Sequence, residues 1–268
     1  MKSLTPRRMR AREYIDSLAA AGRYHFNSRD AQAAFGATPA AVKLALSRLA
    51  HQKLIASPAR GFYVIVPPEY RALGCLPPEQ FIPALMQRLD QPYYAGLLTA
   101  AQFHGAAHQR PQAFQVVVGV SRRLLVCRAV RVVFVVRKRV ADVPVVRLNT
   151  PRGDVRVSSP EATAIDLVGY ADRVGGLGQV ATVLSELAER LDPDVLVTAA
   201  RTAPITWAQR LGYLLDDLGF DTRTAPLKSY VAAAAKLPTV LLPKASAKRA
   251  RRNDAWKLDV NTKVHVEL

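Results

Sequence analysis

The sequence predicts a mixed α+β protein in two parts, a small N-terminal unit over residues 1–66 and a larger C-terminal domain over residues 79–268. A length of 268 residues exceeds that of most single domains, which favours an organisation in two domains. Half of the residues are hydrophobic and 22% are charged, so the chain can bury a core. Two proline pairs, at positions 67–68 and 77–78, predict a semi-rigid connector over residues 67–78.

The chain is strongly basic, with a formal net charge of +17. Such an excess attracts polyanions, either nucleic acid or an anionic membrane surface. The longest apolar runs, such as residues 116–120, fall far short of the roughly 20 residues that span a bilayer. We therefore expect a nucleic-acid partner and no membrane.

Cysteine usage and the N-terminus indicate the compartment. Cys75 and Cys127 lie far apart and form no CxxC pair, which disfavours a disulfide scaffold or a zinc ribbon. No apolar stretch follows the basic residues at the N-terminus, so a secretory signal is not expected. Both features fit a reducing cytoplasm.

Three helices are predicted in the N-terminal unit, over residues 6–20, 27–35 and 38–52. Apolar residues three or four positions apart give each of the longer helices one buried face. Asn27 or Ser28 suits the cap of the second helix, and Gly36 suits the turn that follows it. Thr38 suits the cap of the third helix, and Pro39 suits its first turn.

A β-hairpin is predicted after the third helix. Residues 54–56 and 62–66 are extended in pattern, and a polar turn over residues 57–61 separates them. Helix, short helix, tight turn, helix and hairpin is the order of a winged helix-turn-helix. This motif lays its third helix in the major groove of double-stranded DNA, about 12 Å wide, while its wing touches the backbone or minor groove.

The residues expected to contact DNA lie on three features of this unit. Helix starts suit phosphate groups because their free amides point outward, and the face of the third helix carries small residues that permit close approach beside long ones that reach bases. Eleven Lys and Arg against three acidic residues give residues 1–66 a net charge of +8. A protein-docking module of the same shape is the alternative. The predicted DNA-binding residues are Ser28, Arg29, Thr38, Ala40, Lys43, Ser47, Arg48 and, at the wing tip, Arg60.

The larger domain combines helices and strands that are segregated along the chain, which predicts an α+β fold. A final helix or strand, beginning near Trp256, is expected to pack back on the domain. The predicted helices cover residues 79–89, 93–103, 160–170, 177–190, 193–200 and 206–218, and the predicted strands cover residues 113–120, 130–137, 143–149 and 154–157.

Several residues of this domain suggest chemistry but fit structural roles better. His104 and His108 are four positions apart, yet Gly105 interrupts the helix and no third ligand is near, so we expect a turn or surface role and no metal. The glycines at positions 175, 176 and 178 lack the strand and the Lys-Ser/Thr of a phosphate-binding loop. Glu161 and Asp166 follow a serine cap, and we expect them to be structural. No cofactor and no catalytic residue is predicted.

Two basic clusters, at residues 122–139 and 244–252, have two interpretations. Each either binds the phosphate backbone of nucleic acid or forms a solvated surface.

Three segments carry a resemblance to a known family. They read YAGLLTAAQFHG at residues 94–105, SPEATAIDL at residues 159–167, and a spaced pattern from Trp207 through LGYLL at residues 211–215 to the Leu-Gly pair at 218–219. Together with the winged helix, this layout resembles the AbiEi antitoxins of bacterial abortive-infection toxin–antitoxin systems. One position departs from that family, since Ala162 stands where arginine is frequent.

The resemblance implies a transcriptional autorepressor whose N-terminal domain binds inverted repeats in its own promoter. It also implies that the C-terminal domain counteracts a nucleotidyltransferase-like toxin, in some systems without a stable complex, and that the protein is not an enzyme. Two alternatives remain. One is a nuclease-like C-terminal domain with Glu161 and Asp166 around a magnesium ion. The other is a ligand-responsive repressor with a sizeable apolar pocket in residues 80–268.

Overall fold

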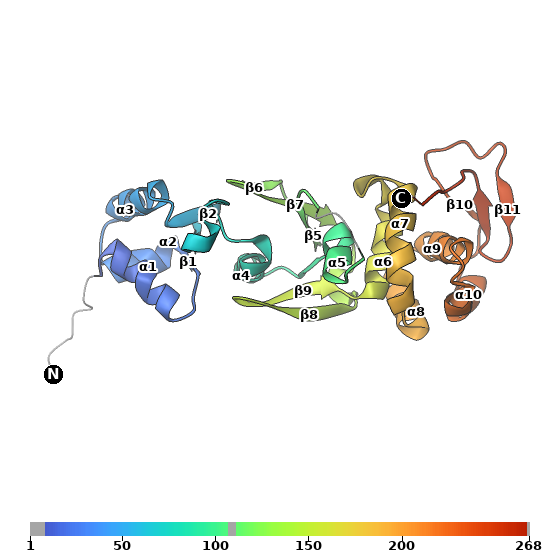
Figure 1. Cartoon of the computed structure of the whole chain (residues 1–268), viewed down its shortest axis with the longest axis horizontal. Coiled ribbons are helices and arrows are strands. Elements are labelled where there is room, and N and C mark those ends of the chain that lie inside the picture. Colours follow the sequence, from blue (N-terminus) through green and yellow to red (C-terminus); the bar gives the residue numbers. More distant parts are fainter. Residues whose placement is uncertain (1–8, 107–110, 267–268) are drawn as a thin grey trace.

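The structure is a computed structural model that describes residues 9–106 and 111–266, and it confirms a mixed α+β fold. The elements follow one another along an elongated molecule, from the N-terminal helices through a central sheet to a helical layer and a small C-terminal sheet (Figure 1). No helix in the described ranges has the length and apolar character needed to cross a membrane.

The N-terminal unit contains three helices and a three-stranded antiparallel sheet of order β1-β3-β2. This arrangement is compatible with a winged helix-turn-helix. Residues 6–8 of the predicted first helix lie outside the described residues, and β1 was not expected from the sequence. The elements are α1 (Ala11–Ala20), β1 (His25–Asn27), α2 (Ser28–Phe35), α3 (Pro39–His51), β2 (Ile55–Ala59) and β3 (Phe62–Ile65).

The predicted caps of α2 and α3 are confirmed. The side chain of Asn27 accepts hydrogen bonds from the amides of Arg29 and Asp30 at 2.8 and 3.0 Å. Thr38 accepts one from the amide of Ala41 at 3.4 Å, and Pro39 occupies the first turn of α3. The prediction of a five-residue hairpin turn was wrong. Strand β2 continues through a bulge to Ala59, and the Ser57 hydroxyl lies within hydrogen-bond distance of the carbonyls of Ala59 and Phe62, at 3.0 and 3.1 Å.

Residues 67–78, predicted to be a connector, are largely packed against the rest of the chain. Short 3₁₀ turns lie at Pro68–Tyr70 (η1) and Pro78–Gln80 (η2), followed by helix α4 (Ile82–Arg88). Cys75 and Leu76 are fully buried in a cluster that includes Phe62 of the N-terminal sheet and Val116 of the central sheet. One apolar core thus joins the N-terminal sheet to the larger domain, while the domain boundaries at residues 66 and 79 stay a prediction.

Arg152 adds a polar link between the two parts. It lies in the turn between strands β8 (Val145–Thr150) and β9 (Gly153–Ser158), and its guanidinium stacks 4.1 Å from the ring centroid of Tyr24 and 5.4 Å from that of Tyr70. It also pairs with Glu69 at 3.0 Å. Because Tyr24 belongs to the N-terminal unit, Arg152 helps to fix that unit against the central sheet.

The central sheet has six strands in the order β6-β7-β5-β4-β9-β8. β5 and β7 run parallel to each other, as do β4 and β9, and the remaining pairs are antiparallel. Four strands were predicted; β6 was missed, and residues 93–95, predicted to be helical, form β4. The strands are β4 (Tyr93–Ala95), β5 (Phe114–Val118), β6 (Leu125–Cys127), β7 (Val130–Val136), β8 (Val145–Thr150) and β9 (Gly153–Ser158).

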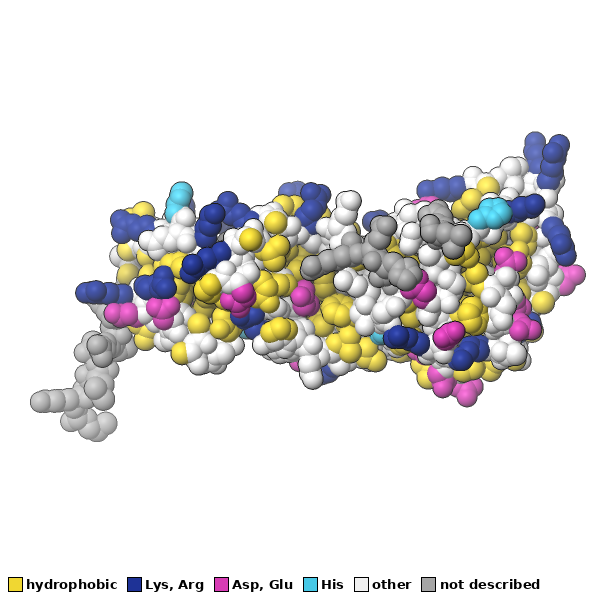
Figure 2. Space-filling model, in the orientation of Figure 1, with side chains coloured by type: hydrophobic (Ala, Val, Ile, Leu, Met, Phe, Trp, Pro, Cys, Tyr) yellow, Lys and Arg dark blue, Asp and Glu magenta, His cyan; other side chains and the backbone are white. Residues whose placement is uncertain are grey.

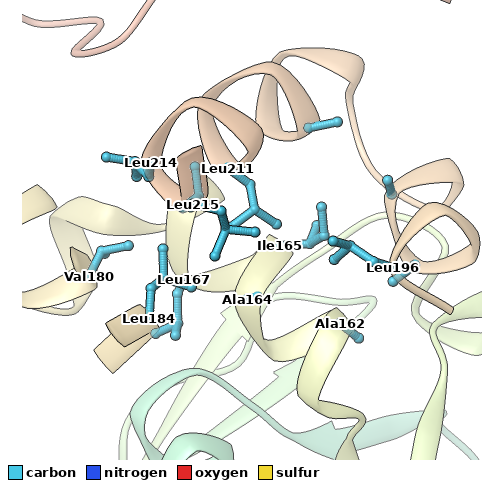
Figure 3. Close-up of a cluster of buried hydrophobic side chains, with 14 of the residues drawn as sticks. Ala162, Ala164, Ile165, Leu167, Val180, Leu184, Leu196, Leu211, Leu214 and Leu215 are labelled. Atoms are coloured by element: carbon cyan, nitrogen blue, oxygen red, sulfur yellow. The ribbon is translucent and has the colours of Figure 1, made fainter. Parts of the chain in front are cut away.

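Helices cover one face of this sheet and form a second layer around α6. Figure 3 shows Ile165 and Leu167 of α6 directed toward leucines of α9, with Val180 and Leu184 of α7 and Leu196 of α8 around them. The four helices predicted from residue 160 onward are confirmed to within a few residues. The helices are α5 (Leu97–Phe103), α6 (Pro160–Gly169), α7 (Leu177–Leu187), α8 (Pro193–Arg201), α9 (Ile205–Asp217) and α10 (Asp221–Ala234).

The C-terminal region was the least predictable part. Helix α10 was not expected, and the segment near Trp256 leads into a three-stranded sheet of order β10-β12-β11. Its strands are β10 (Thr239–Val240), β11 (Arg251–Asn253) and β12 (Leu258–Val260). Trp256 is fully buried against α9, where a Cβ on Gly212 would come within 2.1 Å of the indole ring. A glycine at position 212 is therefore what lets this ring pack on the helix.

Candidate DNA interface

Helix α3 presents one apolar face inward and one mostly polar face outward. Val42, Leu46 and Leu49 recur at helical spacing and are buried in the N-terminal core. On the opposite side lie the four residues predicted to read DNA, Ala40, Lys43, Ser47 and Arg48, and all of them are exposed.

Two further exposed residues, Leu44 and His51, lie on the same outward face and were missed as candidate contacts. Together with Ala40 and Ser47 they form one row along the helix, at spacings of three and four residues, and Leu44 is 54% exposed. An exposed leucine in the middle of this row can contact a thymine methyl group. The signal was present in the sequence, because residue 44 lies outside the buried triplet of Val42, Leu46 and Leu49.

A second group of predicted residues meets at the hairpin turn. The amide of Ser28 donates to the carbonyl of Gly61 at 3.2 Å, which brings Ser28 and Arg29 at the start of α2 beside the turn that carries Arg60. Gly61 has a φ of +69°, a conformation that glycine adopts without strain. Ser28, Arg29 and Arg60 are exposed, as is Thr38 at the start of α3.

Arg88 of α4 supports this turn from the larger domain. Its guanidinium donates to the carbonyl of Arg60 at 3.4 Å and lies 6.0 Å from the ring centroid of Phe62. A hollow of about 460 Å³ is bounded by Asn27, Ser28, Arg29, Gly61 and Arg88. The turn and the start of α2 therefore form one cationic corner, while Ala40, Lys43, Ser47 and Arg48 form a separate face on α3.

Acidic groups near α2 are engaged away from this corner. Asp30 pairs with Arg23 at 2.7 Å and caps the amide of Asn27.

His25, next to this ion pair, carries no charge. Burial, followed by the charge of Arg23, lowers the pKa of its imidazole, so the ring stays neutral under physiological conditions.

Glu161 and Asp166, the residues of the nuclease alternative, are buried and fully engaged. Asp166 is completely buried; it pairs with Arg137 at 2.9 Å and accepts from the Tyr94 hydroxyl at 2.6 Å. Glu161 accepts from the Ser159 hydroxyl at 2.8 Å and from the amide of Asp192 at 3.0 Å. Neither carboxylate faces solvent, and the described residues contain no group of three His, Cys, Asp or Glu able to hold a metal. The expected structural role of both residues follows from these contacts.

His104 is also structural. The ring Nε2 lies 2.7 Å from the carbonyl oxygen of Ser158, and the backbone carbonyl of His104 accepts from Arg190. His104 lies in the turn that follows α5, which confirms the turn role, but it is not a surface residue, since it is only 9% exposed. His108, its proposed partner, lies outside the described residues.

Burial lowers the pKa of the His104 imidazole below its ordinary value, which predicts an acid-sensitive fold. The unfolded chain binds a proton near pH 6.5 that the folded chain resists, so stability is complete above pH 6.5 and falls as the pH is lowered through that value. Denaturant unfolding at pH 7.5 and 5.5 should show a smaller pH difference for His104→Gln than for the wild type. An unchanged difference would contradict this assignment.

The basic cluster at residues 122–139 divides into inward and outward members. Arg137 is buried in the ion pair with Asp166, and Arg139 pairs with Asp142 at 2.8 Å on the surface. Arg123, Arg128 and Arg131 are exposed. Figure 2 shows Lys and Arg side chains near the N-terminal helices, over the central part of the molecule and at its C-terminal end.

A hollow of about 570 Å³ bears on the ligand-sensor alternative. It opens to solvent beside α5, and its wall combines mainly apolar residues, such as Phe103 and Phe114, with polar Thr99, Gln102 and Arg131. Because it is open to solvent, this hollow is not the enclosed pocket expected of a ligand sensor, and that function stays an alternative prediction.

Fold and site define a class of protein: a two-part α+β protein in which a unit compatible with a winged helix is joined to a larger sheet-and-helix domain without an evident catalytic centre in the described residues. Residues 94–217 match the family described as AbiEi antitoxin C-terminal domain. This match is to the family that the resemblance predicted, and it covers most of the larger domain of this chain.

A solved structure with a similar fold is the RV2827C protein from Mycobacterium tuberculosis. The two chains share 18% sequence identity with a TM-score of 0.64, over 95% of this chain and 92% of that one. At this identity the likeness establishes a common fold over almost the whole length. No curated protein sequence matches the chain.

Proposed function

We propose that this protein is a sequence-specific transcriptional autorepressor and the antitoxin of a toxin–antitoxin system. The observation that carries the DNA-binding half is the outward face of α3, where Ala40 and Ser47 lie between Lys43 and Arg48. The match of residues 94–217 to the AbiEi antitoxin C-terminal domain supports the antitoxin half.

The outward face of α3 suits the major groove for physical reasons. Alanine and serine on either side of the exposed Leu44 let the helix backbone approach the base edges, and a flanking arginine can donate two hydrogen bonds to guanine. The exposed cations at the start of α2 and on the turn, Arg29 and Arg60, are placed to neutralise phosphates. Thr38, whose hydroxyl caps α3, marks a helix start that favours a further phosphate.

The larger domain supplies the second activity in this proposal. It counteracts a nucleotidyltransferase-like toxin, which is a functional partner whether or not the two proteins form a stable complex. Since the carboxylates of Glu161 and Asp166 are buried and engaged in structural hydrogen bonds, the domain acts without catalysis by them.

Salt dependence tests the DNA-binding half. Binding of the full-length protein to a duplex carrying the inverted repeats of its own promoter should weaken with salt, with log K falling by about 0.9 per phosphate contact for each unit of log salt. About five such contacts correspond to a loss of about 500-fold between 50 and 200 mM salt. Fluorescence anisotropy measures both the slope and the affinity.

A scrambled duplex of equal length is the control and should bind at least about 1,000-fold more weakly. A flat salt response, or equal affinity for both duplexes, would overturn the repressor proposal. Co-expression with the toxin encoded beside this gene tests the antitoxin half separately, since the protein should restore growth.

A further inference from the structure

A basic cleft lies at the far end of the molecule from α3. It is formed where the C-terminal half of α9 faces β11 and the segment that follows β12, and its volume is about 790 Å³. Most of its wall comes from residues beyond the family-matched segment, which ends at residue 217. The lining residues that matter are Tyr213, Asp217, Arg249, Arg251, Lys263 and His265.

The cations of this cleft are mostly uncompensated. Arg252 is paired with Asp254 at 3.2 Å and with Asp259 at 3.0 Å. In contrast, no ion pair is formed by Arg249, Arg251 or Lys263 within the described ranges, and Asp217 is the one acidic residue on the wall. Figure 2 shows Lys and Arg side chains gathered at this end of the molecule.

The walls of the cleft are held in place by internal hydrogen bonds. The Asn261 side chain accepts from the amide of Leu242 at 2.9 Å and donates to the carbonyls of Leu242 and Ala245. Asn253 accepts from the amide of Trp256, whose indole donates to Asp216 of α9 at 2.8 Å. These contacts, with the pairing of Arg251 to Val260 between β11 and β12, hold the strands beside which Arg249 and Lys263 lie.

One aromatic ring lies among these cations. Tyr213 of α9 is partly buried, and burial together with the neighbouring Asp217 raises the pKa of its hydroxyl, so the group stays neutral. Aromatic side chains beside cations bind nucleotides in other proteins, because the ring stacks on a base while the cations neutralise phosphates.

We infer that this cleft binds a nucleoside phosphate, with its phosphate groups held by Arg249, Arg251 and Lys263 and its base against Tyr213. Like charges brought together in a concavity repel one another, and a bound anion relieves that repulsion. The volume falls in the range of small-molecule sites. The ligand is either a free nucleotide or a short single-stranded segment of nucleic acid, since both present the same phosphate and base chemistry.

The site goes beyond the proposed function, because it is remote from the DNA-reading face and is not needed for operator binding. Isothermal titration of full-length protein with ATP, with a single-stranded RNA hexamer and with inorganic tripolyphosphate tests it. The R249A/R251A/K263A variant should bind each probe that the wild type binds at least 10-fold more weakly. R71A/R173A/K236A, which removes the same residue types from exposed positions outside both basic clusters, should bind within about threefold of the wild type.

Tyr213→Leu separates base recognition from charge, since leucine keeps the apolar packing of the position. It should weaken ATP or RNA binding several-fold and leave tripolyphosphate binding unchanged. Preference for ATP over the hexamer identifies a free-nucleotide site, and the reverse identifies a single-strand site. Absence of saturable binding of ATP and RNA, or an equal loss in both triple variants, would overturn the inference while leaving operator binding by α3 untouched.

Discussion

Replacing Arg137 with methionine should destabilise the fold by about 3–5 kcal/mol, because it leaves the carboxylate of Asp166 buried without its partner. The Arg137 side chain is 3% exposed and that of Asp166 is 0% exposed, so water cannot take over the solvation of the charge. The guanidinium of Arg137 also donates to the Thr202 hydroxyl at 2.9 Å. The substitution therefore removes contacts that join the sheet to α6 and α8. Urea unfolding of the variant measures the resulting loss of stability.

Arg139→Met is the matched control, since Arg139 forms an ion pair of similar length with Asp142 but on the surface. Its side chain is 59% exposed and that of Asp142 is 52% exposed, and such pairs contribute less than about 1 kcal/mol. The R137M/D166N double variant should recover much of the loss, because it removes both charges and keeps an acceptor for Tyr94. If R137M is no less stable than R139M, the buried ion pair of Arg137 and Asp166 does not stabilise the fold as argued.

The pH dependence of the same variant follows from the carboxyl group. Burial raises the pKa of Asp166, and Arg137 acts in the opposite direction. Without Arg137 the folded state holds a proton on Asp166 more firmly than the unfolded state does, so its stability is lost as the pH rises through the folded-state value. The deficit of R137M relative to the wild type should therefore be smaller at pH 5 than at pH 8.

The fold was predictable where local sequence signals decide it. Asn27, Thr38 and Pro39 mark helix starts through their own hydrogen bonds and backbone angles, and the helices that begin at these signals were confirmed. Strand β4 was not predictable, because residues 93–95 become a strand only by pairing with β5 and β9, which lie later in the chain. Helix α10 escaped prediction because Pro226 lies inside it.

The candidate site shows the same division. Exposure of Lys43, Ser47 and Arg48 follows from helical spacing, so the sequence was enough to place them outward. The support of the hairpin turn by Arg88 was not predictable, since 28 positions separate Arg88 from Arg60. Burial of Asp166 against Arg137 and Tyr94 likewise depends on three elements meeting in space.

Replacing Lys43, Ser47 and Arg48 together with alanine should weaken operator binding by at least about 100-fold. The estimate assumes that each base contact contributes about 1–3 kcal/mol, and every 1.4 kcal/mol is a factor of ten in affinity. The three side chains are exposed and alanine favours helix, so the fold should be retained. Gel-shift titration against the promoter repeats measures the affinity, and circular dichroism checks the fold.

The R12A/S229A/K236A variant is the matched control, because it removes the same residue types and the same charge from exposed positions off the outward face of α3. Its operator affinity should stay within about threefold of the wild type. The α3 variant should still protect cells from the toxin if the larger domain carries antitoxin activity by itself. Undiminished operator binding by the α3 variant would show that another surface of the protein reads the DNA sequence. Loss of both repression and protection from the toxin would show that antitoxin activity also requires the outward face of α3.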